Sequence, residues 1–559
     1  MDRSPRFALL ALLSAVAAAA PAAGAPEKRD EIPAPDAAAA AWMERTGHPG
    51  PYVVIPDPAR PRPPFAFSPE DEAMLEEIQL GAFKFFWTDR HVNPATGLVL
   101  DRSSADIASV AGVGFQLSAM VVGVERGWIT REQGEARARK ILSTLLGVPN
   151  NRKAGLFYHF LDAGTGGPRR LGSEDVVSTI DSAILFAGAL TAGSYFGGEV
   201  DELARQMVAA ADWSFFTAGD EHDGTPMEGF ISLGWRPNDF QNDPTGAGSL
   251  LPYFWADADD EQRLVYFIST LAPDEGKRVG PEAYYRLRRK IGAYADTGPM
   301  SFSPWSGALF TKFFAHSWID YAGIGFSIGP DRPDLFNVPH RAPVDWWENS
   351  RRAVRLHRLK AIENPEGLPT LGPDAWGLTA SDAPAGYRVP GVYPDPLPMG
   401  PARPEFDYPT HVPADAYGDG TIAPYGAGSA IIFEPELAVA ALRHYRSLKF
   451  PNGAPLVWRA PQSGGFGFID AFNLAGPGGA PWAASDYVAI DQGPLLLAIE
   501  NARTGLVWRW FHAHPWVMEG MGRLMLCRED DFGRRQREAG TEPPGMPKGA
   551  RPPAGPAPE

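Results

Sequence analysis

Three carboxylates stand directly before a long apolar run in this chain. Glu174, Asp175 and Asp181 lie in the segment SEDVVSTIDS (173–182), and the apolar residues 183–196 follow. A carboxyl group at the edge of a hydrophobic layer has a pKa that burial and neighbouring charges can shift, as general acid and base catalysis requires. Aromatic residues gather in short groups: FKFFW (83–87), FYHF (157–160), LGW (233–235) and YFW (253–255). Carboxylates combined with such groups favour an enzyme that holds sugar rings and cleaves the bonds between them.

Two of these acids can be interpreted in two ways. Asp181 lies at the start of a run that predicts a buried helix, where an unpaired carboxylate is costly. It therefore either pairs with an arginine or works in a cavity, and the second role is favoured. Glu174 follows the loop GGPRRLG, from which it could reach a groove or meet Arg169 or Arg170. Asp175 is expected to face solvent.

Other side chains are candidates for contacts with a sugar. Asp101 and Arg102, in LDRS, could form an ion pair that positions a hydroxyl, or a structural pair at the base of a loop. His159, in FYHF, could touch a hydroxyl, although a histidine among aromatics is often only hydrogen-bonded in place. Aromatic rings fit the C–H face of glucose, although most of the 16 Trp must be core. The candidate stacking residues are Trp235, Trp255, Trp376 and Tyr425.

Composition narrows the class of partner. The net charge of −16 argues against nucleic acid, which needs a positive surface, and fits a neutral poly- or oligosaccharide. The single cysteine, Cys527, excludes intramolecular disulfides and cysteine-based zinc clusters. Nucleotide-binding and metalloprotease motifs are absent, and DxDD at 257–260 imitates a calcium loop only loosely. Neither a metal ion nor a cofactor is expected.

The two ends of the chain differ from its middle. Residues 1–25 combine arginines, an apolar run and small residues, which is the pattern of a secretory signal peptide. A Pro- and Ala-rich tether is expected over 26–67, and a disordered tail over 528–559. Residues 68–527 are expected to form one catalytic domain. We predict a periplasmic or secreted bacterial protein, monomeric and free of the membrane after signal cleavage.

Helix signals dominate the middle of the chain. Ser68-Pro69-Glu70-Asp71 supplies an N-cap, a first-turn proline and early acids, and Thr130–Gln133 is a capping box. Buried and half-solvated helices alternate, which predicts an all-α fold of two concentric layers with short β segments in the loops. One expected helix follows Ser68 and includes the apolar positions from Leu75 to Phe86. The other expected helices lie near 112–125, 131–147, 179–196, 200–216, 257–271, 313–322, 345–361, 434–448, 491–502 and 513–526, and the expected strands at 156–161, 230–235 and 301–303.

A set of phrases between residues 80 and 512 resembles the glycoamylase-like domain of glycoside hydrolase family 144, the bacterial endo-β-1,2-glucanases. The phrases are, in order, FKFFW (83–87), GLVLDRSS (97–104), GFQLSAMVVGVERGWITREQ (114–133), GLFYHFLD (155–162), SEDVVSTIDSAILFAGAL (173–190), LGWRP (233–237), HSWIDYAG (316–323), WGLTASDAPAGY (376–387), DGTIAPYGAGSAI (419–431), GFGFIDAFN (465–473) and IDQGPLLLAIENARTGLVWRWF (490–511). The resemblance implies an (α/α)6 barrel, inverting hydrolysis of β-1,2-glucan and no metal requirement.

The resemblance also implies catalytic roles. Glu261 matches the glutamate of the family's W-x-x-Y-N-E segment, which reads WADADDE (255–261) here with Tyr and Asn replaced and a longer spacing. A second departure is the insertion of Asp175 and a valine within the phrase SEVSTID. Glu261 is the predicted general acid, and Asp181 or Glu174 would activate water. By analogy, Asp382, Asp491 and Gln492 face the same end of the fold.

An alternative interpretation of Glu261 remains open. The start of a helix lowers the pKa of a carboxyl group, so a general acid there needs compensating burial. Glu261 could instead be an ordinary first-turn acid, because Asp257, Asp259 and Asp260 crowd the same turn. Two functional alternatives also stay open: a related glucan hydrolase or transglycosylase of different linkage specificity, and a catalytically silent glucan-binding protein, since a fold proves no activity.

Overall fold

The computed structural model describes residues 60–217, 229–324, 344–397 and 414–524, together with 221–222, 225–226 and 526. The predicted signal peptide, most of the predicted tether and the predicted tail lie outside these residues. Within the described part, no helix combines the length and the apolar character that crossing a membrane requires. The chain folds mostly as helices, with small sheets of two or three strands between them.

Eleven helices of eight or more residues lie in the described ranges. They are α3 (Pro69–Trp87), α4 (Val110–Glu125), α5 (Arg131–Gly147), α6 (Thr179–Phe196), α7 (Gly198–Ala210), α8 (Asp260–Ser269), α12 (Trp346–Glu363), α14 (Pro435–Ser447), α15 (Ala489–Thr504), α16 (Leu506–Ala513) and α17 (Pro515–Arg523). Shorter ones are α9 (Pro281–Arg286), α10 (Tyr321–Ile324) and α13 (Pro424–Ser429).

The predicted capping residues act as caps. The Ser68 hydroxyl accepts the N–H of Asp71 at the start of α3, and Pro69 occupies the first turn. At α5, Thr130 and Gln133 form both bonds of the predicted capping box. Gly197, with φ of 69°, ends α6 and begins α7, a conformation that favours glycine. The predicted start of α3 and the predicted bounds of α5 and α6 are therefore confirmed.

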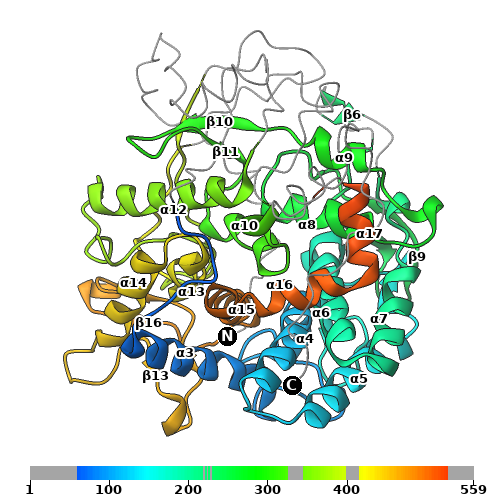
Figure 1. Ribbon diagram of the computed structural model, residues 1–559, viewed down its shortest axis with the longest axis horizontal. Helices are drawn as coiled ribbons and strands as arrows, with labels where there is room; N and C mark the ends of the chain where they lie inside the picture. The colour runs from blue at the N-terminus through cyan, green and yellow to red at the C-terminus, as the bar shows by residue number, and fades with distance from the viewer. Residues whose placement is uncertain are drawn as a thin grey trace, which may run out of the picture.

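The helices form an inner group surrounded by an outer one. α4 packs against α6 and α15, α6 also packs against α8, and α13 packs against α15. In Figure 1, α5 and α7 lie at the right edge and α12 and α14 at the left, with α4, α6, α15 and α13 between them. Nearly every residue of α4, α6 and α15 is buried, whereas α5, α7 and α14 bury only one face. Fully buried helices and half-buried helices therefore alternate, as the sequence predicts.

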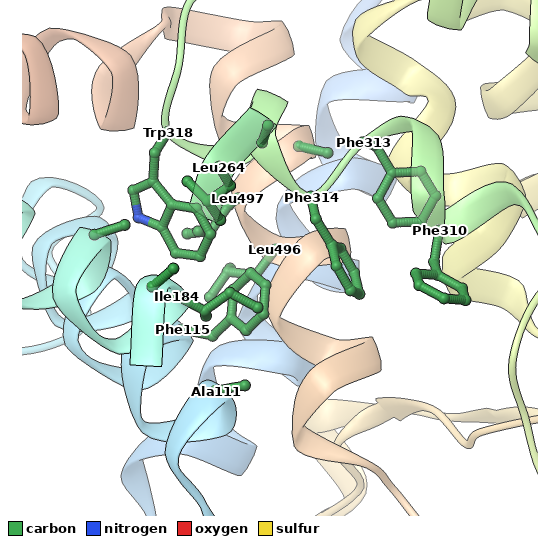
Figure 2. Packing of buried hydrophobic residues seen from close by; sticks show 14 of the residues in the cluster. Ala111, Phe115, Ile184, Leu264, Phe310, Phe313, Phe314, Trp318, Leu496 and Leu497 are labelled. Carbon is green, nitrogen blue, oxygen red and sulfur yellow. The ribbon is translucent and has the colours of Figure 1, made fainter. Parts of the chain in front are cut away.

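Large apolar side chains fill the space among the inner helices. Figure 2 shows Phe115 of α4, Ile184 of α6, Leu264 of α8 and Leu496 of α15 converging with several aromatic rings. The ring of Phe115 lies 4.9 Å from that of Trp318, centre to centre. Each such buried side chain stabilises the fold by about 1.5–3 kcal/mol relative to exposure. This core holds the inner helices, and the side chains at their ends, in fixed positions.

Short strands lie in the connections between helices. They are β1 (Ile107–Ser109), β2 (Arg152–Lys153), β3 (Leu156–Phe157), β4 (Phe160–Asp162), β5 (Val177–Ser178), β6 (Glu221–His222), β7 (Thr225–Pro226), β8 (Gly234–Asp239), β9 (Asp243–Leu250), β10 (Lys290–Ala293), β11 (Met300–Phe302), β12 (Asp395–Pro396), β13 (Trp458–Arg459), β14 (Gly467–Phe468), β15 (Phe472–Asn473) and β16 (Trp482–Ala483). The pairs that these strands form are antiparallel, and β5, β8 and β9 form one three-stranded sheet. β5 leads directly into α6, so this sheet supports the start of that helix.

Some predicted elements differ from the structure. The helix expected at 313–322 is replaced by 3-10 turns at Leu309–Lys312 and Ala315–Ser317, followed by the short α10. The Asp260 carboxylate accepts the N–H groups of Ala315 and His316 at 3.0 and 3.3 Å, which removes them from a helical ladder. The helix expected at 200–216 ends at Ala210, because Asp212 caps a separate turn. The sequence does not predict the hairpin β8–β9 beyond residue 235.

The crossing of α4 and α6 depends on two glycines. A Cβ atom on Gly188 would overlap the backbone carbonyl of Gly114, so the two helices touch through their backbones. We predict that Gly188→Ala destabilises the protein by about 1–3 kcal/mol, because an added methyl group must push α6 away from α4. Thermal unfolding measures the change. The matched control is Gly147→Ala at the end of α5, where nothing lies within 4 Å of the added carbon; equal stability losses in both variants would contradict the close crossing.

Candidate active site

A cavity of about 60 Å³ opens where several inner helices begin. The second or third residues of α6, α8, α13 and α15 all line it. Phe310, Phe314 and Ile184 connect its floor to the aromatic core shown in Figure 2. The complete lining is His159, Ile180, Asp181, Ile184, Glu261, Phe310, Phe314, Ala380, Tyr387, Val389, Tyr425, Ile490 and Asp491. The site is therefore a largely apolar pit with three carboxyl groups and one imidazole.

Asp181 lies in the first turn of α6 and faces the cavity. Ser178 caps the helix, and its hydroxyl donates to the Asp181 carboxylate. The pairing of β5 with β8 and the hydrogen bonds from the Thr179 hydroxyl to the carbonyls of Ser232 and Leu233 fix this turn. Asp181 meets no arginine among the described residues, so the predicted role in a cavity agrees with its position.

His159 lies between two of the predicted acids. Its Nδ1 is 3.5 Å from Glu174 Oε2 and its Nε2 is 3.5 Å from Asp181 Oδ1. Burial alone would lower the pKa of His159, but Asp181, Glu174 and Asp101 raise it to about 9. The ring is thus an imidazolium at neutral pH, which gives both carboxylates an opposite charge. The sequence left open whether Glu174 reaches a groove or meets Arg169 or Arg170, and the structure places it against His159.

Glu261 is the second residue of α8 and is 5% exposed. Burial, followed by the charges of Asp181 and Asp259, raises its pKa to about 8. The burial that a general acid at a helix start requires is therefore present, and it outweighs the effect of the helix dipole. Glu261 is protonated at neutral pH and faces the same cavity as Asp181.

The three neighbouring aspartates are occupied in ion pairs. Asp257 accepts from Arg288 at 2.9 Å and from the Trp305 indole at 2.7 Å. Asp259 caps α8 and accepts from Lys312 at 2.6 Å. Asp260 contacts Arg263 and lies 2.8 Å from the His316 imidazole. These pairs hold the turn in place. Of the four acids in this turn, Glu261 is the one that lines the cavity.

Among the described residues, no group of three or more potential ligands could hold a metal ion.

Arg102 connects several loops around the cavity. Its guanidinium lies 3.8 Å from Asp101, as the sequence predicted, and 3.2 and 3.6 Å from Asp382 and Asp486. The carbonyl of Asp101 accepts the N–H of Ala489 at 2.7 Å, next to the start of α15. Asp101, Arg102 and Asp382 do not line the cavity. The contacts of Asp101 and Arg102 fit the structural alternative, a pair at the base of a loop, and Asp382 belongs to the same ion-pair network.

The residues predicted from α13 and α15 divide into two groups. Asp491 and Tyr425 line the cavity, and Tyr425 is anchored by bonds of 2.9 Å to the Thr379 hydroxyl and the Ala380 carbonyl. Gln492 instead points into the core and donates to the Phe468 carbonyl at 2.8 Å. The predicted sugar contact of Gln492 is wrong, because successive helix residues face different directions.

Three of the four predicted stacking residues lie in the core. The rings of Trp235 and Trp376 are at most 2% exposed, which leaves no free face for a sugar, so this prediction is wrong for both. Trp255 is 3% exposed and donates from its indole to Thr179 at 2.8 Å, so it supports the start of α6 instead. Asp175 is likewise buried, not solvated: it accepts the N–H of Leu171.

Sequence reasoning missed several residues of the site. Tyr387 and Val389 lie in a Pro-rich segment, and both pack against the hydrophobic core. Asp470 is 2% exposed and accepts the N–H of Asp382 at 2.7 Å. A signal for Asp470 was available, because it is a lone carboxylate in the apolar phrase GFGFIDAF.

Comparisons with known proteins agree with this architecture. Residues 252–515 match the family model named Glycoamylase. Residues 252–515 are thus similar to a glycoamylase-like domain. The resemblance inferred from the sequence phrases is thereby confirmed, and the matched segment includes Glu261, Tyr425 and Asp491 of the cavity.

A curated relative of this glycoamylase-like chain is the exo β-1,2-glucooligosaccharide sophorohydrolase (non-reducing end) of Parabacteroides distasonis. It is 27% identical over 485 residues, which are 82% of this chain and 58% of the relative. The chain thus spans little more than half the length of that protein.

Two solved structures share the fold. The endo-β-1,2-glucanase of Chitinophaga pinensis, in a complex with sophorotriose and glucose, has a TM-score of 0.62 at 24% identity, over 82% of this chain and 98% of its own. The β-1,2-glucanase of Parabacteroides distasonis has a TM-score of 0.63 at 22% identity, over 82% of this chain and 60% of its own.

The raised pKa of Glu261 predicts a pH-dependent cost in stability. The folded-state pKa of about 8 exceeds the usual 4.5, so the folded protein holds this proton more tightly than the unfolded chain does. The free energy of unfolding therefore decreases as the pH rises from 4.5 to 8. Glu261→Gln removes the titrating group. We therefore expect the variant to match the wild type near pH 4 and to melt at a higher temperature above pH 8. Thermal unfolding across this range measures the difference.

The matched control is Glu202→Gln on the exposed face of α7. Its melting temperature should follow the wild type at every pH. A melting difference between Glu261→Gln and wild type that is constant with pH would contradict the burial of a titrating Glu261.

Proposed function

We propose that the helices close into an (α/α)6 barrel. Outer and inner helices alternate along the chain as α3, α4, α5, α6, α7 and α8, and again as α12, α13, α14 and α15. Contacts between α4 and α15 join the two ends of this order, as ring closure requires. The 3-10 turns between residues 309 and 317 contact α8 and take the place of an inner helix. In such a ring the inner helices start at one end, where the cavity lies.

We propose that the protein is a glycoside hydrolase that cleaves β-1,2-linked glucan. The observation that carries this proposal is a pair of unlike carboxyls in one cavity: Glu261, protonated by burial, and Asp181, which faces an imidazolium. A protonated carboxyl that can donate and a second carboxyl in the same cavity are what hydrolysis of a glycosidic bond needs. The choice of a β-1,2-linkage rests on the names of the curated relative and the similar structures.

The reaction would proceed by single displacement. Glu261 gives its proton to the glycosidic oxygen as the bond to the anomeric carbon breaks. Asp181 accepts a proton from the water that attacks that carbon from the opposite face, directly or through a substrate hydroxyl, and the configuration inverts. Glu174 is 2% exposed behind His159 and does not line the cavity, so Asp181 is the better candidate for the base. Glu174 would then orient His159.

A protein that only binds glucan would not need Glu261 in this state. Keeping a carboxyl without a cation in an apolar cavity destabilises the fold at neutral pH, and its three aspartate neighbours show that this turn can satisfy buried acids with cations. The export signal in residues 1–25 would place this hydrolase in the periplasm or outside the cell, acting as a monomer on its polysaccharide.

The proposal predicts the effect of replacing the acid. Glu261→Gln should lower the release of reducing sugar from linear β-1,2-glucan by about 10²–10⁴-fold, the usual contribution of a general acid. Glu202→Gln should retain wild-type turnover. Tests on β-1,3- and α-1,4-glucans should show little release. Release from one of these instead identifies a hydrolase of another linkage, and binding without any release identifies a glucan-binding protein.

The proposal also predicts an alkaline limit of activity. Since Glu261 must carry its proton, kcat/KM should fall as the pH rises through about 8, where the free enzyme loses that proton. Initial rates on linear β-1,2-glucan from pH 5 to 10 provide the profile. An activity that increases between pH 8 and 10 would be incompatible with Glu261 as the acid.

A further inference from the structure

A second pair of carboxyl groups lies beside the cavity and is not used in the mechanism above. Asp491, in the first turn of α15, is 3% exposed and lines the cavity. Asp470, between β14 and β15, lies behind it and is 2% exposed. One oxygen of Asp470 accepts the N–H of Asp382 at 2.7 Å. The loop that carries Asp382 and the start of α15 thus meet through these two acids.

The hydrogen bonds of this pair require a proton. Asp470 Oδ1 and Asp491 Oδ2 are buried, and neither accepts a hydrogen bond from an N–H or O–H group of the described residues. The two side chains lie close enough to interact with one another. Two ionised carboxylates cannot form a hydrogen bond, because both are acceptors only. A single proton held between them would supply the donor that these two oxygens lack.

The nearby cation, Arg102, is shared with other carboxylates, so a proton is the better way to reduce the negative charge of the pair. Arg102 is the cation that acts on both acids, but its guanidinium already contacts Asp382, Asp486 and Asp101 at 3.2, 3.6 and 3.8 Å. Tyr387 and Tyr425 add buried hydroxyls, and Asp382 adds a further negative charge. The same cavity holds Asp181, Glu261 and the His159 imidazolium, and that imidazolium already lies between Asp181 and Glu174. Burial accordingly raises the pKa of Asp470 to about 6 and that of Asp491 well above its usual value.

We propose that Asp470 is a positioning residue that keeps a proton on the Asp491 carboxyl, so that this wall of the cavity meets a sugar hydroxyl as a neutral hydrogen-bonding group. The sugar in this statement rests on the function proposed above. A neutral wall suits an uncharged ligand, because an ionised pair in the same place would have to draw in water or a cation to be stable. Loss of the proton at alkaline pH would weaken binding, whereas loss of the proton of Glu261 would stop the chemical step.

The proton itself is tested without any ligand. Infrared spectra at pH 7 should show a carbonyl band of protonated carboxyls, to which Glu261 also contributes. Asp470→Asn should remove the part of this band that comes from the shared proton, because the asparagine amide can donate to Asp491 and no proton is needed. Glu261→Gln should remove the other part. Asp486→Asn is the matched control: Asp486 accepts from the hydroxyls of Ser103 and Ser104 at 2.7 Å and needs no proton. It should retain the band. An identical band in wild type and Asp470→Asn overturns the proposal.

The effect on binding is tested in the Glu261→Gln background, where the ligand stays intact. Calorimetry with a linear β-1,2-glucooligosaccharide should show a Kd at least about tenfold weaker at pH 9 than at pH 6, the effect of about one unit of pKa change on binding. Adding Asp470→Asn should remove this pH dependence, which a merely structural loss would not do. Equal pH dependence with and without Asp470→Asn overturns the role of Asp470. Absence of binding at both pH values contradicts the proposed function, while the infrared spectra still decide the shared proton.

Discussion

The site depends on carboxyl groups placed where inner helices begin inside an apolar layer. Asp181, Glu261 and Asp491 each occupy the first turn of such a helix, at one shared cavity. The positive end of each helix favours a carboxylate, whereas burial disfavours it. The nearest partner in the described part of the chain differs from one position to the next. It is an imidazolium and a serine hydroxyl at Asp181, a second carboxyl at Asp491, and no cation at Glu261, where burial keeps the carboxyl protonated.

Cationic side chains pair with the aspartates that precede Glu261. Within a single turn, Asp257 meets Arg288, Asp259 meets Lys312 and Asp260 meets Arg263, and the next residue, Glu261, faces the cavity. These pairs are buried, so removing one partner would leave an uncompensated charge. They are thus the supports of the turn, and they let it present one protonated carboxyl in a fixed place. The tight crossing of α4 and α6 fixes the position of α6, the helix that carries Asp181 in its first turn.

The sequence allowed the helices, their caps and the principal acids to be predicted, because these depend on local patterns. Ser68, Thr130 and the apolar run after Asp181 indicated helix boundaries that the structure confirms. The sequence indicates that Glu261 needs burial to act as an acid, but it does not show that burial, since burial depends on contacts distant in the sequence. The same reason explains the errors for Trp235, Trp376 and Gln492: the residue type suits a sugar contact, but only the packed fold shows which side of the chain faces the cavity.

The most direct test of the account is a crystal structure of the Glu261→Gln variant with a linear β-1,2-glucooligosaccharide. The account predicts a glycosidic oxygen within hydrogen-bond distance of the side-chain amide that replaces the Glu261 carboxyl. It also predicts a water molecule or substrate hydroxyl that links Asp181 to the opposite face of the same anomeric carbon. A saccharide whose scissile bond lies away from both side chains, or which meets the new amide and Asp181 on one and the same face of the ring, would contradict it.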